Sequence, residues 1–319
     1  MQLISWNVAR AGPDRITCQV AALAARAPDI IALQEVRINR VPEYRSALAR
    51  AGFAHIVDGF AGVHCDFKGR RATGVLVASA CECTAVPDLR AAMELPWPER
   101  LLSVVVATAW GPVELHTVYV PVGYGGRGLD VRVRTLECLY RGLARATGRH
   151  RILCGDFNLP QQETVEGEVI TFGQTLRKSG AFAITNALMH RSERNVLLGL
   201  AAFDLADVYR NLHGYLRQDL SWYHPVSGNG FRLDHVLASR SLRAATCQYL
   251  DHFRTMRAEY YPHGFTRLSD HAALEVVFAP EIHGADASTT ATLHRSYCLD
   301  GHGMQSFCHV RTGEIARKS

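Results

Sequence analysis

The amino-acid sequence predicts an α/β domain in which two β-sheets pack face to face with helices on the outside. Two observations favour this class. Short apolar runs that suit buried strands recur along residues 1–280, with amphipathic helical segments between some of them. Both halves of this stretch run strand, helix, strand and then hairpins, without a change of composition between them. We therefore expect one domain over 1–280 and a flexible tail over 281–319, where the apolar periodicity fades.

The first half begins with two predicted strands, at 2–8 and 29–34, each a short apolar run. Between them Ile16, Val20 and Leu23 recur at helical spacing after a Gly-Pro-Asp start, which predicts a helix. A strand is expected at 74–80. A hairpin follows, with strands at 101–109 and 113–120 joined by a Trp-Gly-Pro turn.

The second half repeats this order. A helix is expected over 129–143, because one apolar stripe runs along it at helical spacing. A buried strand follows at 151–154 and ends in Gly-Asp-Phe-Asn. Further strands are expected at 220–224, 231–238, 244–251 and 272–278.

The overall composition is that of a globular protein, since 48% of the 319 residues are hydrophobic and 20% are charged. The net charge of +5 is compatible with a polyanionic partner but is too common to identify one. No apolar run approaches the roughly 18 residues of a membrane-spanning helix. Nine cysteines and an N-terminus without a secretory signal predict reduced thiols in a cytoplasmic protein with no membrane contact.

Polar side chains stand at the ends of the predicted strands and need an explanation. They are Asn7, Glu35, Tyr119, Asp156, Asn158, Asp270 and His271. Taken singly, each has a structural alternative as a turn residue, a cap or a solvated side chain. Asp234 is different, because it lies inside an apolar strand and a buried carboxylate is costly unless it is paired. A histidine is its natural partner.

Together these residues suit the hydrolysis of a phosphate ester, which requires charge neutralisation and an activated water. Mg²⁺ takes oxygen ligands, commonly one or two carboxylates with the other positions filled by water and phosphate. Glu35 and Asp270 suit that role, with the amide of Asn7 nearby. The cofactor expected is therefore Mg²⁺, with Mn²⁺ as a substitute.

The remaining polar residues suit proton transfer and charge stabilisation. Asp156 can accept a proton from water, and Asn158 can orient that water. A histidinium at His271, held by Asp234, can donate to a phosphate oxygen, and the hydroxyl of Tyr119 can do the same.

At these positions the sequence resembles the endonuclease/exonuclease/phosphatase superfamily, and within it exonuclease III and the apurinic/apyrimidinic endonucleases. The resembling blocks are Ile4–Val8, Asp29–Glu35, Val118–Pro121, Gly155–Asn158, Phe231–His235 and Leu268–His271. The resemblance implies a four-layer, DNase I-like sandwich and Mg²⁺-assisted attack of water on phosphorus. It makes Glu35 the main metal ligand with Asn7 and Asp270 close by, Asp156 the base beside Asn158, Tyr119 a phosphate contact, and His271 with Asp234 the pair that stabilises phosphoryl charge.

The resemblance also implies that the substrate is DNA and that the protein acts in DNA repair. We expect the DNA to be double-stranded and the protein to be a monomer. Trp222, Phe231 and Leu233 match residues that line the pocket for a baseless sugar in the repair branch. The alternative is that they are core residues of two neighbouring strands, because aromatic residues are common in strands.

Three departures bear on the substrate. Val36-Arg37 follows Glu35 where the repair branch has Thr-Lys, Val122 follows Tyr-Val-Pro in place of Asn, and Ala9 replaces an acidic residue. They motivate a second hypothesis, a hydrolase of the same superfamily that acts on phosphoinositide, sphingomyelin or another small phosphoester. A third hypothesis, an inactive nucleic-acid binding module, is disfavoured because such a module has no need of the buried charges.

Overall fold

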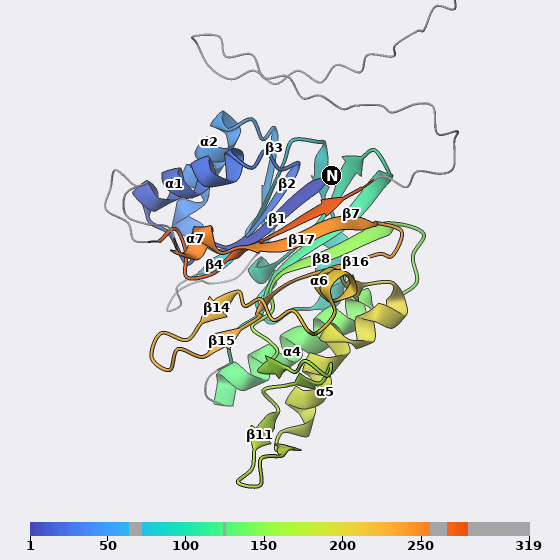
Figure 1. Ribbon diagram of the computed structural model, residues 1–319. Helices are drawn as coiled ribbons and strands as arrows, with labels where there is room; N and C mark the ends of the chain where they lie inside the picture. Colours follow the sequence, from blue (N-terminus) through green and yellow to red (C-terminus); the bar gives the residue numbers. More distant parts are fainter. Residues whose placement is uncertain (64–71, 124–125, 256–266, 280–319) are drawn as a thin grey trace, which may run out of the picture. The chain divides into compact units, whose positions relative to one another are not determined.

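The computed structural model describes residues 1–63, 72–123, 126–255 and 267–279. The tail predicted over 281–319 lies outside this part of the chain, and Met1–Pro280 forms one unit by its internal contacts. Two six-stranded mixed sheets lie at its centre (Figure 1). No helix in the described residues is long and apolar enough to cross a membrane.

The first sheet joins the two ends of the described chain. Its strands, in spatial order, are β17 (Ala244–Leu250), β18 (Ala273–Phe278), β1 (Gln2–Asn7), β2 (Ile30–Arg37), β4 (Thr73–Ser79) and β3 (His55–Asp58). Only the β1–β2 pair is parallel, and its register sets Asn7 opposite Gln34. The carboxyl ends of β1 and β2 therefore meet at one edge of the sheet.

The second sheet is built in the same way from the middle of the chain. Its order is β13 (Ala206–Asp207), β16 (Asp234–Ala238), β8 (His150–Asp156), β7 (Gly111–Tyr119), β6 (Leu101–Thr108) and β5 (Cys83–Ala85). Here β7 and β8 form the parallel pair, with Tyr119 opposite Asp156. The antiparallel partner β16 sets Asp234 on the other side of Asp156.

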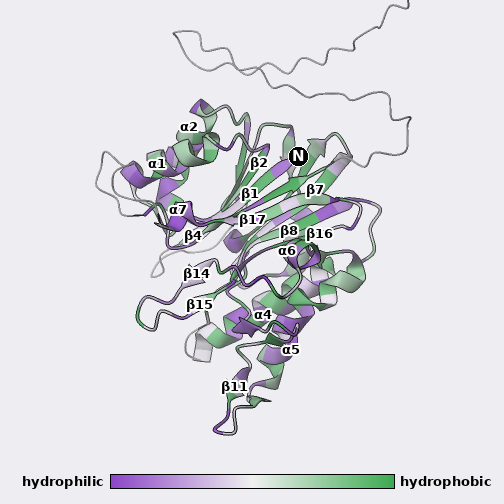
Figure 2. Ribbon diagram, in the orientation of Figure 1, coloured by the Kyte–Doolittle hydropathy of each residue, from purple (hydrophilic) through white to green (hydrophobic). Residues whose placement is uncertain are grey.

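Three apolar cores separate four layers, which confirms the predicted sandwich. One core lies between the sheets and includes Leu3, Val75, Leu115 and Ile152. A second packs the first sheet against α1 (Pro13–Ala24) and α2 (Val41–Arg50). A third packs the second sheet against α4 (Gly126–Leu143) and α5 (Ala187–Leu197). Figure 2 shows hydrophobic residues along the strands and mixed colouring on the outer helices.

Shorter elements connect these layers. The helices are α3 (Pro87–Met93), α6 (Val208–His213), α7 (His252–Thr255) and the 3₁₀ turns η1 (Ile38–Arg40), η2 (Pro98–Arg100) and η3 (Gly199–Phe203). Three small hairpins pair β9 (Gln162–Glu163) with β10 (Val169–Ile170), β11 (Gln174–Leu176) with β12 (Phe182–Ile184), and β14 (Trp222–Tyr223) with β15 (Gly230–Phe231).

The prediction of one continuous strand over 231–238 is wrong, because this segment forms two strands, β15 and β16. Where β16 begins, the backbone N–H groups of Leu233, which lies between the two strands, and of Asp234, the first residue of β16, donate to the Ser221 hydroxyl at 2.9 and 3.2 Å. Arg232 turns inward to Glu163 and Asp207. The strand predicted over 220–224 is likewise reduced to the two residues of β14.

Candidate active site

The polar residues predicted from the sequence meet where the two sheets end. Asn7, at the end of β1, donates from Nδ2 to Oδ2 of Asp156, at the end of β8, over 2.8 Å. This hydrogen bond joins the first sheet to the second. Ser269 adds a further tie, since its hydroxyl donates to the Asn7 carbonyl over 2.6 Å. The segment that carries Asp270 and His271 is thereby held against the end of β1.

Asp156 lies at the centre of this cluster and is almost fully buried. Its Oδ1 accepts the backbone N–H of Asn158 at 2.9 Å, and its Oδ2 accepts the Asn158 amide at 3.2 Å as well as Asn7. Burial and the nearby Asp234 carboxylate raise the pKa of Asp156 to about 7. The carboxyl group is thus an effective base at neutral pH and above.

His271 and Asp234 form a buried pair, with Nδ1 of the imidazole 2.8 Å from Oδ2 of the carboxylate. Burial disfavours the imidazolium, but the charge of Asp234 and its hydrogen bond outweigh burial, so the pKa of His271 rises to about 10. The main chain is fixed by Trp6, whose indole N–H donates to the His271 carbonyl over 2.9 Å. His271 is therefore a cation that holds Asp234 through Nδ1 and makes no hydrogen bond from Nε2 within the described residues.

Glu35 is turned toward Tyr119 by an irregularity in β2. The register with β4 shifts between Leu33 and Val36, and Glu35 has a positive φ of 58°. The Tyr119 hydroxyl donates to Glu35 Oε1 over 2.7 Å. Burial, and then the Glu35 charge, hold the pKa of Tyr119 well above 10, so the phenol keeps its proton.

Backbone strain is concentrated at this edge. Ala9, Arg10, Glu35 and Asn158 all have positive φ, between 50 and 58°, although none is glycine. Gly155 also has a positive φ, of 139°, and a side chain there would strike the Val118 carbonyl of the neighbouring strand. The Gly-Asp-Phe-Asn block thus needs its glycine so that β8 can approach β7 next to Asp156.

Several residues at the site were not predicted from the sequence. Arg10, which follows the Ala9 that stands in place of the expected acidic residue, lies with Nε 2.8 Å from Glu35 Oε2. The guanidinium of Arg100 lies 4.3 Å from the ring centres of both Trp97 and Tyr119. These arginines carry no motif, and their positions depend on loops whose course the sequence pattern does not predict.

The three predicted substrate-lining residues are placed differently. Trp222 lies against the catalytic cluster, because its indole N–H donates to Asp270 Oδ2 over 3.2 Å and its ring centre is 6.2 Å from that of His271. The Phe231 ring is 5.9 Å from Trp222. Leu233 is only 5% exposed. Trp222 and Phe231 are thus half-buried at the site, and Leu233 lies below its surface.

The residues proposed for Mg²⁺ offer oxygen atoms, and one of these atoms, Glu35 Oε2, has the Arg10 guanidinium as its partner at 2.8 Å. This oxygen is buried, and Arg10 balances its charge. No cluster of three or more His, Cys, Asp or Glu side chains suited to a metal occurs in the described part of the chain. Mg²⁺ needs only one or two carboxylates from the protein, with water and phosphate as its other ligands. The residues fit such an ion.

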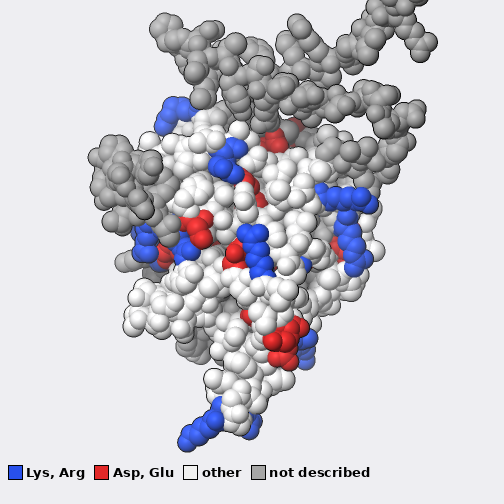
Figure 3. Space-filling model, viewed as in Figure 1, with Lys and Arg blue, Asp and Glu red and all other residues white. Residues whose placement is uncertain are grey.

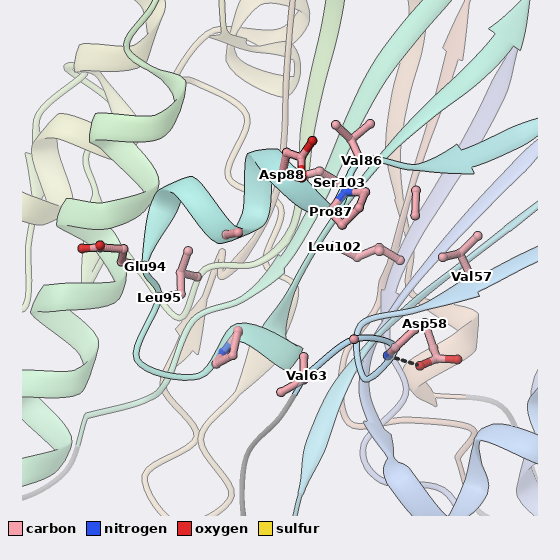
Figure 4. A pocket seen from close by; sticks show the side chains of 15 residues that line it. Val57, Asp58, Val63, Val86, Pro87, Asp88, Glu94, Leu95, Leu102 and Ser103 are labelled. Carbon is pink, nitrogen blue, oxygen red and sulfur yellow. Dashed lines mark hydrogen bonds between the residues drawn. The ribbon is translucent and has the colours of Figure 1, made fainter.

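Two cavities lie outside the cluster. One, of roughly 570 Å³, is bounded by Val57 and Asp58 of β3, by α3 and by Leu102 (Figure 4). Its walls are mostly apolar, and Asp58 is paired with Arg45 at 2.6 Å, so it offers little for phosphate chemistry. The other, of roughly 470 Å³, borders Phe231 and is lined by polar side chains that include Arg210 and Arg232. The predicted catalytic groups line neither cavity.

Comparisons with known proteins identify the family and the fold of the chain. Residues 4–271 match the model of the Endonuclease/Exonuclease/phosphatase family. A comparison of the sequence with curated proteins gives no match.

Solved structures resemble the fold over most of its length. An AP endonuclease from Archaeoglobus fulgidus is 20% identical, with a TM-score of 0.61, over 87% of this chain and 99% of its own. A variant of the 3′ phosphatase NExo from Neisseria, bound to a product DNA hairpin, is 20% identical, with a TM-score of 0.62, over 88% and 99%. Humanized TDP2 from D. rerio is 16% identical, with a TM-score of 0.58, over 88% and 98%. At these identities the likeness concerns the fold.

Proposed function

The chain belongs to the endonuclease/exonuclease/phosphatase family, whose members hydrolyse ester bonds, and on this premise we propose that it is a Mg²⁺-dependent phosphodiesterase acting on DNA. We propose further that it resembles exonuclease III and the abasic-site endonucleases in its choice of substrate. The observation that supports the proposal is the contact network at the sheet ends, where Asp156 is bonded to Asn7, His271 to Asp234, and Glu35 to Tyr119, the cross-strand neighbour of Asp156.

In this proposal Asp156 takes the proton of the attacking water. Its two oxygens are held by the amides of Asn7 and Asn158, so the carboxylate is oriented before substrate arrives. A pKa of about 7 matches the requirement that a general base be deprotonated yet basic at the working pH. Removal of the proton leaves hydroxide, which forms the new P–O bond as the P–O bond to the ester oxygen breaks, and the alkoxide that leaves takes a proton from water.

His271 stabilises the charge that develops on the phosphoryl oxygens. Asp234 holds Nδ1, so the cationic ring donates from Nε2 to an oxygen of the substrate. The Tyr119 hydroxyl is the second donor, and it would exchange its hydrogen bond with Glu35 for one with phosphate. Glu35, with Asn7 and Asp270 nearby, would hold the divalent ion, which would neutralise negative charge on the phosphate and orient it.

Two features favour DNA as the substrate. The Trp222 ring lies next to His271 and the Phe231 ring lies next to Trp222, where the sugar and bases that flank a phosphodiester would be. The AP endonuclease and the DNA-bound 3′ phosphatase are similar in fold, which raises the expectation by analogy. On the face shown in Figure 3, Lys and Arg are scattered among Asp and Glu rather than gathered in one patch.

The direct test is incubation of the purified chain with Mg²⁺ and a DNA duplex that carries one abasic site. We expect strand cleavage beside that site, or shortening from the 3′ end, on a denaturing gel, and no reaction in EDTA. Blunt duplex, RNA and phospholipid substrates run in parallel. An intact duplex, when a known nuclease cuts it in the same buffer, would contradict the proposal. Turnover of a small phosphodiester that excess duplex leaves unaffected would favour the small-phosphoester alternative instead.

A further inference from the structure

A row of aromatic rings leads outward from the catalytic histidine. From His271 to Trp222 the ring centres are 6.2 Å apart, from Trp222 to Phe231 5.9 Å, and from Phe231 to Phe172 6.1 Å, the last pair stacked at 22°. Phe172 lies between β10 and β11, well before its neighbours of the row in the sequence. The outer member of the row therefore comes from a different part of the chain than the two inner rings.

The Phe172 ring is held in place and yet exposed. Its backbone N–H donates to Glu193 Oε2 over 3.0 Å, and Glu193 is fully buried in α5. The next residue, Gly173, packs so closely on α5 that a side chain would strike the His190 nitrogen and the Asn186 carbonyl. Even so, 36% of Phe172 is exposed. The contacts of its backbone with α5 therefore hold the Phe172 ring in a position where part of it is exposed to solvent.

One buried arginine connects this ring to the catalytic base. Arg132 is 2% exposed, and its guanidinium lies 5.0 Å from the centre of the Phe172 ring. It donates to the Asn158 carbonyl and to Glu193 Oε1, each over 2.8 Å. Phe172 and the Asp156–Asn158 turn thus share a single buried ion pair, so the ring has a defined position relative to the reacting phosphate.

From this geometry we infer that Phe172 is the outer part of a binding site for an unpaired nucleobase of the DNA strand that is cut. The inference rests on the proposed function. A base is a flat π-system that stacks on an aromatic ring regardless of its identity. The row starts at the catalytic cluster, and each of its steps exceeds the roughly 3.4 Å rise per nucleotide of one strand. The stacked base consequently lies a few nucleotides from the reacting phosphate.

Binding is measured with the full chain carrying Asp156→Asn, so that no cleavage intervenes. Fluorescence anisotropy gives Kd for a labelled single-stranded oligonucleotide and for matched strands in which one nucleotide at a time is replaced by a base-free tetrahydrofuran spacer. We expect the spacer at one position to weaken binding on the order of tenfold, as for the loss of one stacked base. In Phe172→Ala that position should lose its effect, because the stacking partner is gone.

Substitutions at Phe172 separate stacking from support of the fold. Phe172→Trp should keep the penalty for the missing base, whereas Phe172→Leu, which keeps apolar bulk without a ring, should lose it. Leu176→Ala is the matched control, since Leu176 lies in the hairpin that follows Phe172, is 57% exposed and is outside the row. Leu176→Ala should show the same Kd values, and the same penalty for the missing base, as the chain with Phe172 intact. The salt dependence of Kd should be the same in the three Phe172 variants and in Leu176→Ala, because stacking releases no counterions.

The outcomes distinguish the inference from the proposed function. If Phe172→Ala weakens the complete strand and every spacer strand equally, or weakens none, the base site is disproved while DNA remains the substrate. If the Asp156→Asn chain with Phe172 intact binds neither the complete strand nor the spacer strands, and the enzyme with Asp156 intact cuts no DNA, the proposed function fails. The base site then fails with it.

Discussion

Among the carboxylate–histidine pairs of the described residues, two that lie in the second sheet or beside it are almost equally short and equally buried. Asp234 lies 2.8 Å from the ring of His271, at the open edge where the sheets end. Glu114 lies 2.9 Å from the ring of His116, two residues further along the same strand, β7. All four side chains are at most 7% exposed. The pairs differ in what surrounds them.

The charges around the two pairs have opposite signs. His271 faces Asp156 and Asp270 in addition to Asp234, and these carboxylates raise its pKa against the effect of burial. Around His116, burial lowers the pKa and the cations Arg145 and Arg151 add to that effect, so Glu114 cannot reverse it. His271 is therefore an imidazolium at neutral pH, whereas His116 is neutral.

The hydrogen bonds of His116 agree with a neutral ring. Its Nε2 lies against Glu114, and its Nδ1 lies 2.8 Å from the Ser103 hydroxyl. One nitrogen donates and the other accepts, which satisfies the ring completely. Glu114 is further bound by Arg145 at 2.6 Å. The comparison teaches that a carboxylate–histidine pair is not in itself a catalytic device. A proton donor arises only where additional carboxylates keep the ring charged and one nitrogen stays available.

The largest difference between the site around His271 and the pair around His116 should come from Asp156→Asn, a substitution next to His271. We expect turnover of the DNA substrate to fall by about 10²–10⁴-fold, because the amide cannot accept the proton of water. The free energy of unfolding at pH 8 should be unchanged or higher, since the native state raises the pKa of Asp156 and thus disfavours its charged form. Steady-state kinetics and urea denaturation measure the two quantities. Near-normal turnover would refute Asp156 as the base.

Glu114→Gln should give the opposite pattern and a smaller effect. We expect a loss of about 1–3 kcal/mol in the free energy of unfolding, because Arg145 and His116 lose a charged acceptor in a buried setting. Turnover should stay within about twofold. Glu137→Gln is the control, because its 3.8 Å ion pair with Arg191 lies at the surface and should cost at most about 1 kcal/mol. A large loss of turnover in Glu114→Gln at unchanged stability would remove the distinction between the pairs.

The two pairs also show how far the sequence leads. The α/β sandwich followed from recurring apolar runs, and Asp234 stood out because it interrupts one of them. His271 could be matched to it because strand-end polar residues converge at a shared edge. Glu114 and His116 interrupt the strand Val113–Val120 in the same way, so this pair was open to the same argument. What the pattern could not give was the sign of the surrounding charge, which depends on Arg145 and Arg151 from other elements.

Loop geometry was the other limit. Arg10 and Arg100 reach the site through turns, and the contact of Arg132 with Asn158 joins helix α4 to the turn that follows the next strand, β8. Side chains of this kind have no periodicity to reveal them, because their positions are decided by tertiary packing. The long strand predicted over 231–238 failed for a related reason, since the Ser221 hydroxyl accepts the backbone N–H groups of Leu233 and Asp234 where β16 begins.

The smallest effect, and the sharpest test of the comparison, is the dependence of stability on pH in EDTA. The pKa of His116 is lowered on folding, so the unfolded state binds the proton more tightly and stability falls as pH drops below about 6.5. The pKa of His271 is raised to about 10, so its contribution is complete below about 6.5 and is lost as pH rises through 10. Each proton changes the slope by at most about 1.4 kcal/mol per pH unit.

Substitution of each histidine should therefore flatten a different side of the profile of unfolding free energy against pH. His116→Gln should reduce the slope between pH 7 and 5, at values above the range where Glu114 titrates, and His271→Gln should reduce it between pH 8 and 10. Urea denaturation at each pH gives both slopes. If His271→Gln instead flattened the acid side, His271 would be neutral in the native protein. The surplus of carboxylates around it would then not keep the ring charged, and the difference between the two pairs would vanish.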